Sequence, residues 1–266
     1  PGPHDTSGPI DERGYTLLGE GWGDRAGIAV AGLGDFDGDG FSDMAVGADR
    51  EDSGASNAGA VYVLLGPVAG DLSLEDADGR YLGVEENQNA GYAVAGAGDV
   101  NGDGYGDMIV GGPGQDSTYS QRGAAWVVLG PVTEFVSLSE AEGQILGRYT
   151  SDRFGHSVTG AGDVNGDGFD DVWIGAPEMG LDPSEPTGAA VLLYGPVSGG
   201  ILADDADFTV WGDSMDDEAG HDVAGGGDFD GDGLSDLLVG VSDSDENGSL
   251  AGSAILTSAV DSSTCP

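Results

Sequence analysis

A four-fold internal repeat constrains the fold of this chain more than any other feature of its sequence. A nine-residue phrase rich in Asp, Asn and Gly recurs at spacings of 64, 64 and 65 residues. The copies read DFDGDGFSD from Asp35, DVNGDGYGD from Asp99, DVNGDGFDD from Asp163 and DFDGDGLSD from Asp228. Self-similarity at such a period is typical of folds that stack one supersecondary unit several times. We therefore expect residues 1–266 to form a single repeat-built domain.

The segments around each phrase repeat as well, and each is typical of a β-strand. A glycine-punctuated strand precedes the phrase, and a short apolar run such as MAVG or LLVG follows it. The length of that run and its flanking Asp and Gly favour a buried strand over a helix. A third strand begins at Gly59, Gly123, Gly188 and Gly252, and a fourth strand follows in GRYLGV, GQILGR and DFTVWG. The fourth copy of this last strand, GYTLLG, stands near the start of the chain.

Four strands per repeat are about the content of one propeller blade, so the sequence predicts an all-β propeller of four four-stranded blades. The chain starts on an outermost type of strand and ends on a third type of strand. We therefore expect residues 14–19 to complete the blade begun by residues 220–260. That pairing of the N- and C-terminal strands would close the ring and remove free strand edges. Residues 1–13 and 261–266 are expected to be flexible tails.

Each phrase has the oxygen spacing of a calcium-binding loop. Side-chain oxygens stand at positions 1, 3, 5 and 9, and position 7 offers a backbone carbonyl. Calcium takes about six to eight oxygens at roughly 2.3–2.6 Å. Glycines at positions 4 and 6 permit the tight, left-handed backbone that wraps such an ion. The sequence predicts up to four calcium ions, in loops 35–43, 99–107, 163–171 and 228–236, with the ligands Asp35, Asp37, Asp39, Phe41, Asp43, Asp99, Asn101, Asp103, Tyr105, Asp107, Asp163, Asn165, Asp167, Phe169, Asp171, Asp228, Asp230, Asp232, Leu234 and Asp236.

Other readings of these loops fit less well. An EF-hand loop needs a bidentate Glu at position 12, where this chain has Val46, Val110, Ile174 and Val239. Magnesium demands a stricter octahedral geometry and retains several waters. Acidic turns without metal are the remaining alternative, but their clustered carboxylates would repel one another. Because the second and third loops carry Asn at position 3, we expect them to bind calcium more weakly.

Composition excludes several classes of function. The chain has 49 acidic residues and seven Arg, with no Lys, and its formal net charge is -42. Phosphate backbones would be repelled, so nucleic acid is not expected as a partner. No apolar run approaches the roughly 18 residues of a membrane-spanning helix. Cys265 is the only cysteine, which excludes an internal disulfide and a cysteine metal site.

At these residues the sequence resembles the FG-GAP repeats of integrin α-subunit propellers and their bacterial relatives. The third repeat matches best, with Phe154-Gly155 before the loop and Gly175-Ala176-Pro177 after the apolar strand. The other repeats have Ala-Gly before the loop. The resemblance covers nearly the whole chain and implies a propeller with calcium loops on one face. Propellers of the family commonly have more blades than the four that this chain can build.

Histidine and tryptophan fit packing roles better than catalysis. His156 and His221 share a repeat position with Ile28 and Tyr92, which favours packing, and His4 lies in the N-terminal tail. Trp126, Trp173 and Trp211 fall within predicted strands, whereas Trp22 lies in a loop, where it could contact a ligand. No G-x-S-x-G, H-E-x-x-H or C-x-x-C motif occurs, so no enzyme activity is predicted.

We therefore expect an extracellular or cell-surface calcium-binding module that is not an enzyme and adheres to protein or carbohydrate. The blade-connecting loops 49–58, 113–122, 177–187 and 242–251 are the expected recognition surfaces. A monomer is expected, with a dimer as the alternative. Two other functions remain open: the propeller part of a secreted polysaccharide lyase or phospholipase-like enzyme, and a purely structural spacer.

Overall fold

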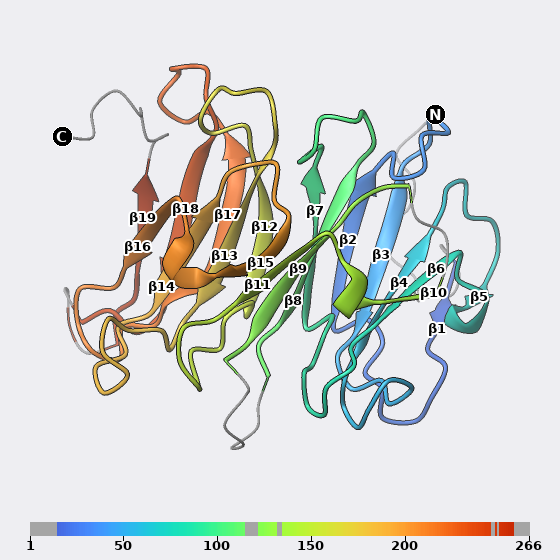
Figure 1. Cartoon of the computed structure of the whole chain (residues 1–266), viewed down its shortest axis with the longest axis horizontal. Helices are drawn as coiled ribbons and strands as arrows, with labels where there is room; N and C mark the ends of the chain where they lie inside the picture. The colour runs from blue at the N-terminus through green and yellow to red at the C-terminus, as the bar shows by residue number, and fades with distance from the viewer. Residues whose placement is uncertain (1–14, 115–121, 132–134, 246–247, 249, 258–266) are drawn as a thin grey trace, which may run out of the picture.

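The regular secondary structure of the described part of the chain is almost entirely β-strand (Figure 1). The computed structural model describes residues 15–114, 122–131, 135–245, 248 and 250–257. The predicted tails, with His4 and Cys265, lie outside these residues, as does most of the loop 113–122. The helices of the described part are the 3₁₀ turns η2 (Leu74–Asp76), η3 (Leu138–Glu140) and η4 (Ala203–Asp205). None of them is long and apolar enough to cross a membrane.

Each repeat forms one antiparallel sheet in which the innermost, second and third strands pair in chain order, as in propeller blades. Sheet 1 contains β2 (Ala29–Gly34), β3 (Asp43–Ala48), β4 (Ala60–Leu64) and β6 (Gly79–Leu82). Sheet 2 contains β7 (Ala93–Gly98), β8 (Asp107–Gly112), β9 (Ala124–Val128) and β11 (Gly143–Leu146). Sheet 3 contains β12 (Ser157–Gly162), β13 (Asp171–Ala176), β14 (Ala189–Leu193) and β16 (Phe208–Trp211). Sheet 4 has three strands in the described residues, β17 (Ala219–Gly227), β18 (Asp236–Val241) and β19 (Ser253–Thr257).

A short parallel strand from the following repeat extends the outer edge of sheets 1 and 2. β10 (Phe135–Ser137) pairs with β6, and β15 (Gly199–Leu202) pairs with β11. β1 (Leu17–Leu18) and β5 (Leu72–Ser73) form the same kind of pair, with Leu18 opposite Ser73 as Leu82 is opposite Ser137. β1 thus holds the place of the outermost strand of a sheet that would precede sheet 1.

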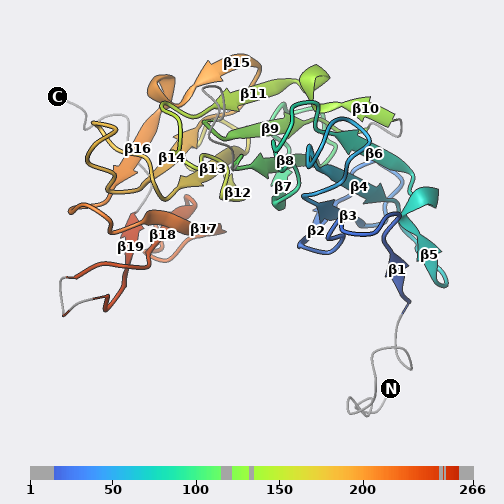
Figure 2. The ribbon, with the colours of Figure 1, turned by 90° about the horizontal axis from the view of Figure 1, so that it is seen from below.

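The predicted pairing of the N- and C-terminal strands is wrong for the described chain. β1 pairs with β5, whereas β19 is the edge of sheet 4, which lacks the predicted fourth strand. Figure 2 shows the two strands at opposite ends of an open arc.

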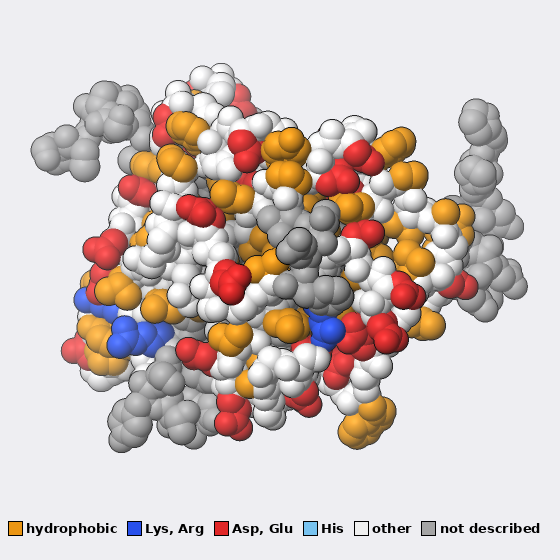
Figure 3. All heavy atoms as spheres, turned by 45° about the vertical axis from the view of Figure 1, so that its right-hand side comes forward, with side chains coloured by type: hydrophobic (Ala, Val, Ile, Leu, Met, Phe, Trp, Pro, Cys, Tyr) orange, Lys and Arg blue, Asp and Glu red, His pale blue; other side chains and the backbone are white. Residues whose placement is uncertain are grey.

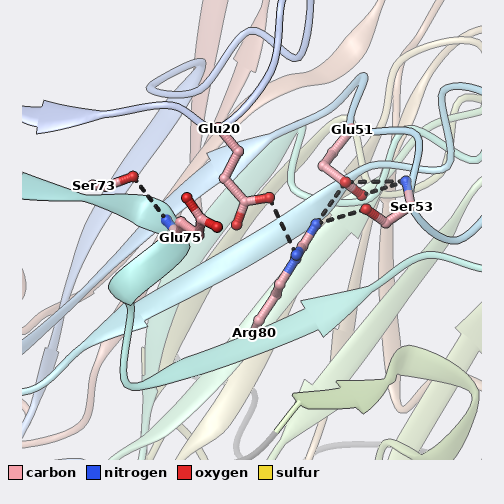
Figure 4. Close-up of polar contacts among 6 residues, drawn as sticks. All are labelled: Glu20, Glu51, Ser53, Ser73, Glu75 and Arg80. Carbon is pink, nitrogen blue, oxygen red and sulfur yellow. Dashed lines mark hydrogen bonds and ion pairs between the residues drawn. The ribbon is translucent and has the colours of Figure 1, made fainter.

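Polar contacts explain why β1 stays beside sheet 1. Arg80 of β6 binds Glu20, which follows β1, at 3.2 Å and Glu51 at 2.6 Å (Figure 4). Asp71 accepts a hydrogen bond of 2.7 Å from the backbone N–H of Thr16. The Arg80 and Glu51 side chains are only 12% and 5% exposed, so this ion pair is shielded from water. The N-terminal strand is therefore fixed on the side of the molecule opposite β19.

The core lies within the sheets and between neighbouring sheets. The innermost strands β2, β7, β12 and β17 pack against one another in chain order. The side chains of Trp126 and Trp173 are completely buried, which confirms their predicted place in the core. Trp211 packs at the margin of the core, and Trp22 is fully exposed.

Candidate metal centres

The four acidic loops join the innermost strand of each sheet to the next strand, so all four lie at the same end of their sheets. The position-4 and position-6 glycines of the first loop, Gly38 and Gly40, have φ angles of 80° and 92°. The equivalent glycines of the other loops also have positive φ, as the sequence predicts. Each loop therefore turns through two left-handed residues that bring its alternate side chains to one side.

Backbone N–H groups orient the side chains at positions 1, 3 and 5 of each loop. In the first loop, Asp35 accepts from Gly40 N at 3.0 Å, Asp37 from Asp39 N at 3.0 Å, and Asp39 from Phe41 N at 2.8 Å. The same three bonds recur in the second, third and fourth loops. One oxygen of each side chain is thus held by the backbone of the loop itself.

Carboxylate oxygens of the residues at positions 1, 3 and 5 converge in the first and last loops. Single carboxylate oxygens of Asp35, Asp37 and Asp39 lie within 4.8 Å of one another, and so do those of Asp228, Asp230 and Asp232. Asp35 Oδ1 is buried and has no hydrogen-bond partner among the described residues. A buried carboxylate oxygen without a partner is costly unless a cation compensates it. The donor set consists only of oxygens, which suits calcium.

The middle loops differ because position 3 is an amide. Asn101 Nδ2 donates to Asp103 Oδ2 at 2.8 Å, and Asn165 Nδ2 donates to Asp167 Oδ2 at 2.9 Å. The amide oxygen keeps the position of the Asp oxygen, since it accepts from the position-5 N–H. These loops therefore offer the same arrangement of oxygens with one negative charge fewer.

The position-9 aspartates also brace the sheets. Asp43, Asp107, Asp171 and Asp236 are at most 2% exposed, and each accepts the position-2 N–H at 2.6–2.8 Å. In the first three loops the other oxygen accepts from a glycine just beyond the third strand, at 2.7–2.9 Å. The sequence analysis missed these glycines, although a Gly-Pro follows the third strand in each of the first three repeats. They are Gly66, Gly130 and Gly195.

Burial raises the pKa of Asp107 and of Asp171 to about 6. The two backbone hydrogen bonds lower each pKa, and the neighbouring carboxylates at loop positions 5 and 1 raise it. A divalent cation held among these carboxylates would favour the ionised form and reverse the shift.

Consecutive loops are also bonded to each other through the backbone. Gly106 N donates to the Asp35 carbonyl at 2.9 Å, and Asp170 N donates to the Asp99 carbonyl at 3.1 Å. The Asp170 carboxylate in turn accepts from Asp99 N at 2.8 Å. The first three loops are therefore connected in a row.

The position-7 side chain of the second, third and fourth loops covers the position-4 glycine of the loop before it. A Cβ on Gly38 would lie 2.4 Å from Tyr105 Cε1, and a Cβ on Gly102 would lie 2.8 Å from Phe169 Cε1. The sequence analysis assigned position 7 only a carbonyl ligand and missed this packing role.

A row of rings runs along the innermost strands at the opposite end. The Tyr92 and His156 centroids are 5.2 Å apart, and those of His156 and His221 are 4.9 Å apart. His156 contacts the Tyr92 hydroxyl through Nε2 at 3.3 Å and the His221 carbonyl through Nδ1 at 3.1 Å. Burial lowers the pKa of His156 to about 4. This geometry agrees with the packing role expected for both histidines.

Comparison with known proteins supports the repeat assignment. The FG-GAP repeat model matches residues 26–64, 90–128 and 154–193, and each match contains one acidic loop. The chain is 32% identical over 230 residues to integrin alpha pat-2 of Caenorhabditis briggsae, covering 82% of this chain and 18% of that protein. It is 31% identical over 224 residues to integrin alpha-PS2 of Drosophila melanogaster, covering 80% and 15%. For integrin alpha-8 of Gallus gallus the identity is 31% over 222 residues, covering 80% and 20%.

The chain spans a fifth or less of the length of these three relatives. Within that span, the matched repeats coincide with sheets 1 to 3 from the innermost strand to the third strand. The chain therefore contains three FG-GAP repeats and is similar to integrin α subunits over about four fifths of its length.

Proposed function

We propose that this chain is an extracellular, non-enzymatic adhesion module, a propeller-like array stabilised by up to four calcium ions. The observation that carries the proposal is the convergence of carboxylate oxygens in the first and last loops, together with the buried Asp35 oxygen that has no partner in the described chain. The similarity to integrin α subunits supports an adhesive role. The ligands would be the side chains at positions 1, 3, 5 and 9 and the carbonyl at position 7.

Recognition is assigned to the loops between the second and third strands of the sheets. Because successive strands are antiparallel, these loops lie at the end of each sheet opposite the acidic loops. The loops 49–58, 177–187 and 242–251 would therefore contact a ligand without contacting calcium. Calcium would support adhesion indirectly by stabilising the sheets that present these loops.

The surface charge narrows the class of ligand. Acidic side chains are spread over the face in Figure 3, while Lys and Arg are sparse. A net charge of -42 disfavours sulfated or otherwise anionic glycans. A protein surface with basic groups, or a neutral carbohydrate, is the better complement.

Calcium titration calorimetry tests the metal proposal directly. The wild-type chain should bind about four ions, and Asp39→Ala should lose one of them because it removes the position-5 carboxylate of the first loop. Asp205→Asn, an exposed acid of η4 outside the loops, is the control and should still bind four. Binding of fewer ions by this control would argue against loop-specific sites.

Thermal unfolding gives an independent measure. Each site at about 100 times its Kd would add about 2.7 kcal/mol, which corresponds to a rise in Tm of roughly 5–11 °C for a domain of this size. A Tm that is equal in calcium and in chelator, with no heat of binding, would contradict the proposal.

A further inference from the structure

The first and last sheets each expose one apolar face that is buried in the sheets between them. Val30 of sheet 1 is 70% exposed, whereas the equivalent Val94, Val158 and Val223 are 8%, 8% and 7% exposed. In sheets 2 to 4 this position is covered by the preceding sheet, because the innermost strands pack in chain order. The exposed face of sheet 1 is therefore shaped to receive a preceding sheet.

Sheet 4 has the complementary exposed face. Phe229 is 68% exposed, whereas the equivalent Phe36, Val100 and Val164 are at most 1% exposed. Leu256 of β19 is 55% exposed, although the equivalent residues of β4, β9 and β14 are completely buried. In sheets 1 to 3 these positions are covered by the following sheet. Sheet 4 is thus shaped to receive a following sheet.

A glycine in sheet 4 fits a neighbour that the single chain does not supply. A Cβ on Gly47, Gly111 or Gly175 would lie 2.0–2.2 Å from a glycine carbonyl oxygen of the following sheet. Gly240 is the equivalent residue of sheet 4, and the nearest atom to its Cβ would be 3.4 Å away. Its φ is not positive, so no backbone strain requires glycine there. The carbonyl that would meet Gly240 in the same arrangement belongs to Gly27.

The two ends are also complementary in strands. Sheet 4 has no outermost strand in the described residues, and β1 is an outermost strand without the three inner strands of its own sheet. In sheets 1 to 3 the outermost strand pairs antiparallel with the third strand in one register, Ala60 with Leu82, Ala124 with Leu146 and Ala189 with Trp211. The same register places Leu18 of β1 opposite Ser253 of β19.

One cation of sheet 1, Arg25, which pairs with Asp49 of its own sheet at 2.9 Å, would face the acidic end of the chain in this arrangement. No Lys or Arg follows Arg153 in the sequence, so the last sheets carry acids alone. Arg25 occupies the same repeat position in sheet 1 as Asn89 does in sheet 2. The Asn89 side chain donates to the Asp49 carbonyl of the preceding sheet at 3.0 Å. In a continued stack, Arg25 would face the segment of sheet 4 that contains Ser242 and Glu218, which are bonded at 3.0 Å.

We propose that a second copy of this chain binds head to tail, so that sheet 1 of one copy covers sheet 4 of the other and β1 becomes the outermost strand of that sheet. The contact continues the sheet-to-sheet interface already present three times within the chain. The open arc leaves both end faces accessible (Figure 2). Since the contact joins two different surfaces, two copies close a ring if the arc geometry allows it, and otherwise a longer oligomer forms.

Light scattering with size-exclusion chromatography tests the contact. The experiment needs calcium and physiological salt, because the charge of -42 on each copy would otherwise oppose association. The expected mass is 53 kDa, twice 26.5 kDa, or a higher multiple. A 26.5 kDa monomer at every concentration would overturn the proposal and leave the end faces to further repeats of a longer polypeptide or to the chain's own termini.

Gly240→Ala is the most specific disrupting variant. In the single chain its methyl group would come no closer than 3.4 Å to another atom, an ordinary contact with Asp222, so Tm in dilute monomeric conditions should not change. In the proposed contact it would collide with the Gly27 carbonyl of the second copy. The variant should therefore be monomeric. Gly200→Ala is the control, because a Cβ there meets nothing within 4 Å and the residue lies away from both end faces. Val30→Asp should also abolish association, whereas Leu181→Asp, equally exposed in a loop, should not. Unchanged association of Gly240→Ala would refute the contact.

Cross-linking tests the strand register. In a Cys265→Ser background, Leu18→Cys and Ser253→Cys are made in separate chains and then mixed under mild oxidation. The register makes these residues a pair of closely spaced side chains, so a disulfide-linked heterodimer should form. Thr257→Cys, near the other end of β19, should give none with Leu18→Cys. Absence of the heterodimer, or a disulfide that forms only within a chain carrying both substitutions, would contradict the proposal.

Discussion

The packing of each position-7 side chain on the preceding loop can be measured with paired glycine substitutions. Gly102 and Gly104 lie in the same loop and have φ angles of 75° and 91°. Alanine at either position costs roughly 1–2 kcal/mol, because an L-residue disfavours left-handed backbone. At Gly104 a Cβ meets nothing within 4 Å, but at Gly102 it lies 2.8 Å from Phe169 Cε1. Overpacking should add about 1–3 kcal/mol at Gly102 alone.

The expected difference between Gly102→Ala and Gly104→Ala is therefore about 1–3 kcal/mol, or roughly 2–12 °C in Tm. Thermal unfolding in chelator measures it without a contribution from calcium affinity. The fourth loop shows which side chain would avoid the collision. Its position-7 residue is Leu234, which would lie 3.5 Å from a Cβ on Gly166. Phe169→Leu should thus recover the added loss in Gly102→Ala. Equal losses for the two glycine variants, or no recovery, would refute the packing argument.

Two further predictions concern buried charges. Arg80→Met should destabilise the fold by about 3–5 kcal/mol, because it leaves the buried Glu51 carboxylate without its cation; urea unfolding measures the loss, and hydrogen exchange should rise at residues 15–20. An unchanged exchange rate there would mean that Arg80 does not hold β1. For His156, burial lowers the pKa from 6.5 to about 4, with Arg153 lowering it further and Asp222 raising it. The unfolded chain binds the proton more readily, so stability is full above pH 6.5 and falls as the pH is lowered through 4. NMR titration gives the pKa, which would be 6.5 if burial had no effect, and His156→Phe should lessen the acid sensitivity.

The repeat made most of the fold predictable. Strand order, strand type and the place of each acidic loop follow from a sequence pattern that occurs four times. Where one copy of the pattern is ambiguous, the other copies indicate which strand it forms. Trp126 and Trp173 could be assigned to the core because each stands within an apolar strand. The positive φ of Gly38 and Gly40 also followed from the local sequence.

The position of β1 could not be predicted in the same way. The strand phase identifies β1 as an outermost strand but does not identify its partner. The choice depends on the contacts of Arg80 with Glu20 and Glu51, residues up to 60 positions apart that no repeat marks. The hydrogen bonds from the position-9 aspartates to the glycines beyond the third strand could not be predicted for a similar reason. These glycines lie 23 or 24 residues further along the chain.

The stacking of sheets only against their sequence neighbours has a consequence for how the chain unfolds. In such an array, stability is a sum of the intrinsic stability of each sheet and of the interfaces between them. Sheets 2 and 3 each share two interfaces, whereas sheets 1 and 4 share one within the chain. Sheet 4 has three described strands and no ion pair among its described residues, so opening should begin there and move inward. Amide exchange should therefore be fastest in β17–β19 and slowest in β8 and β13, and a protease should shorten the chain stepwise from its C-terminal side.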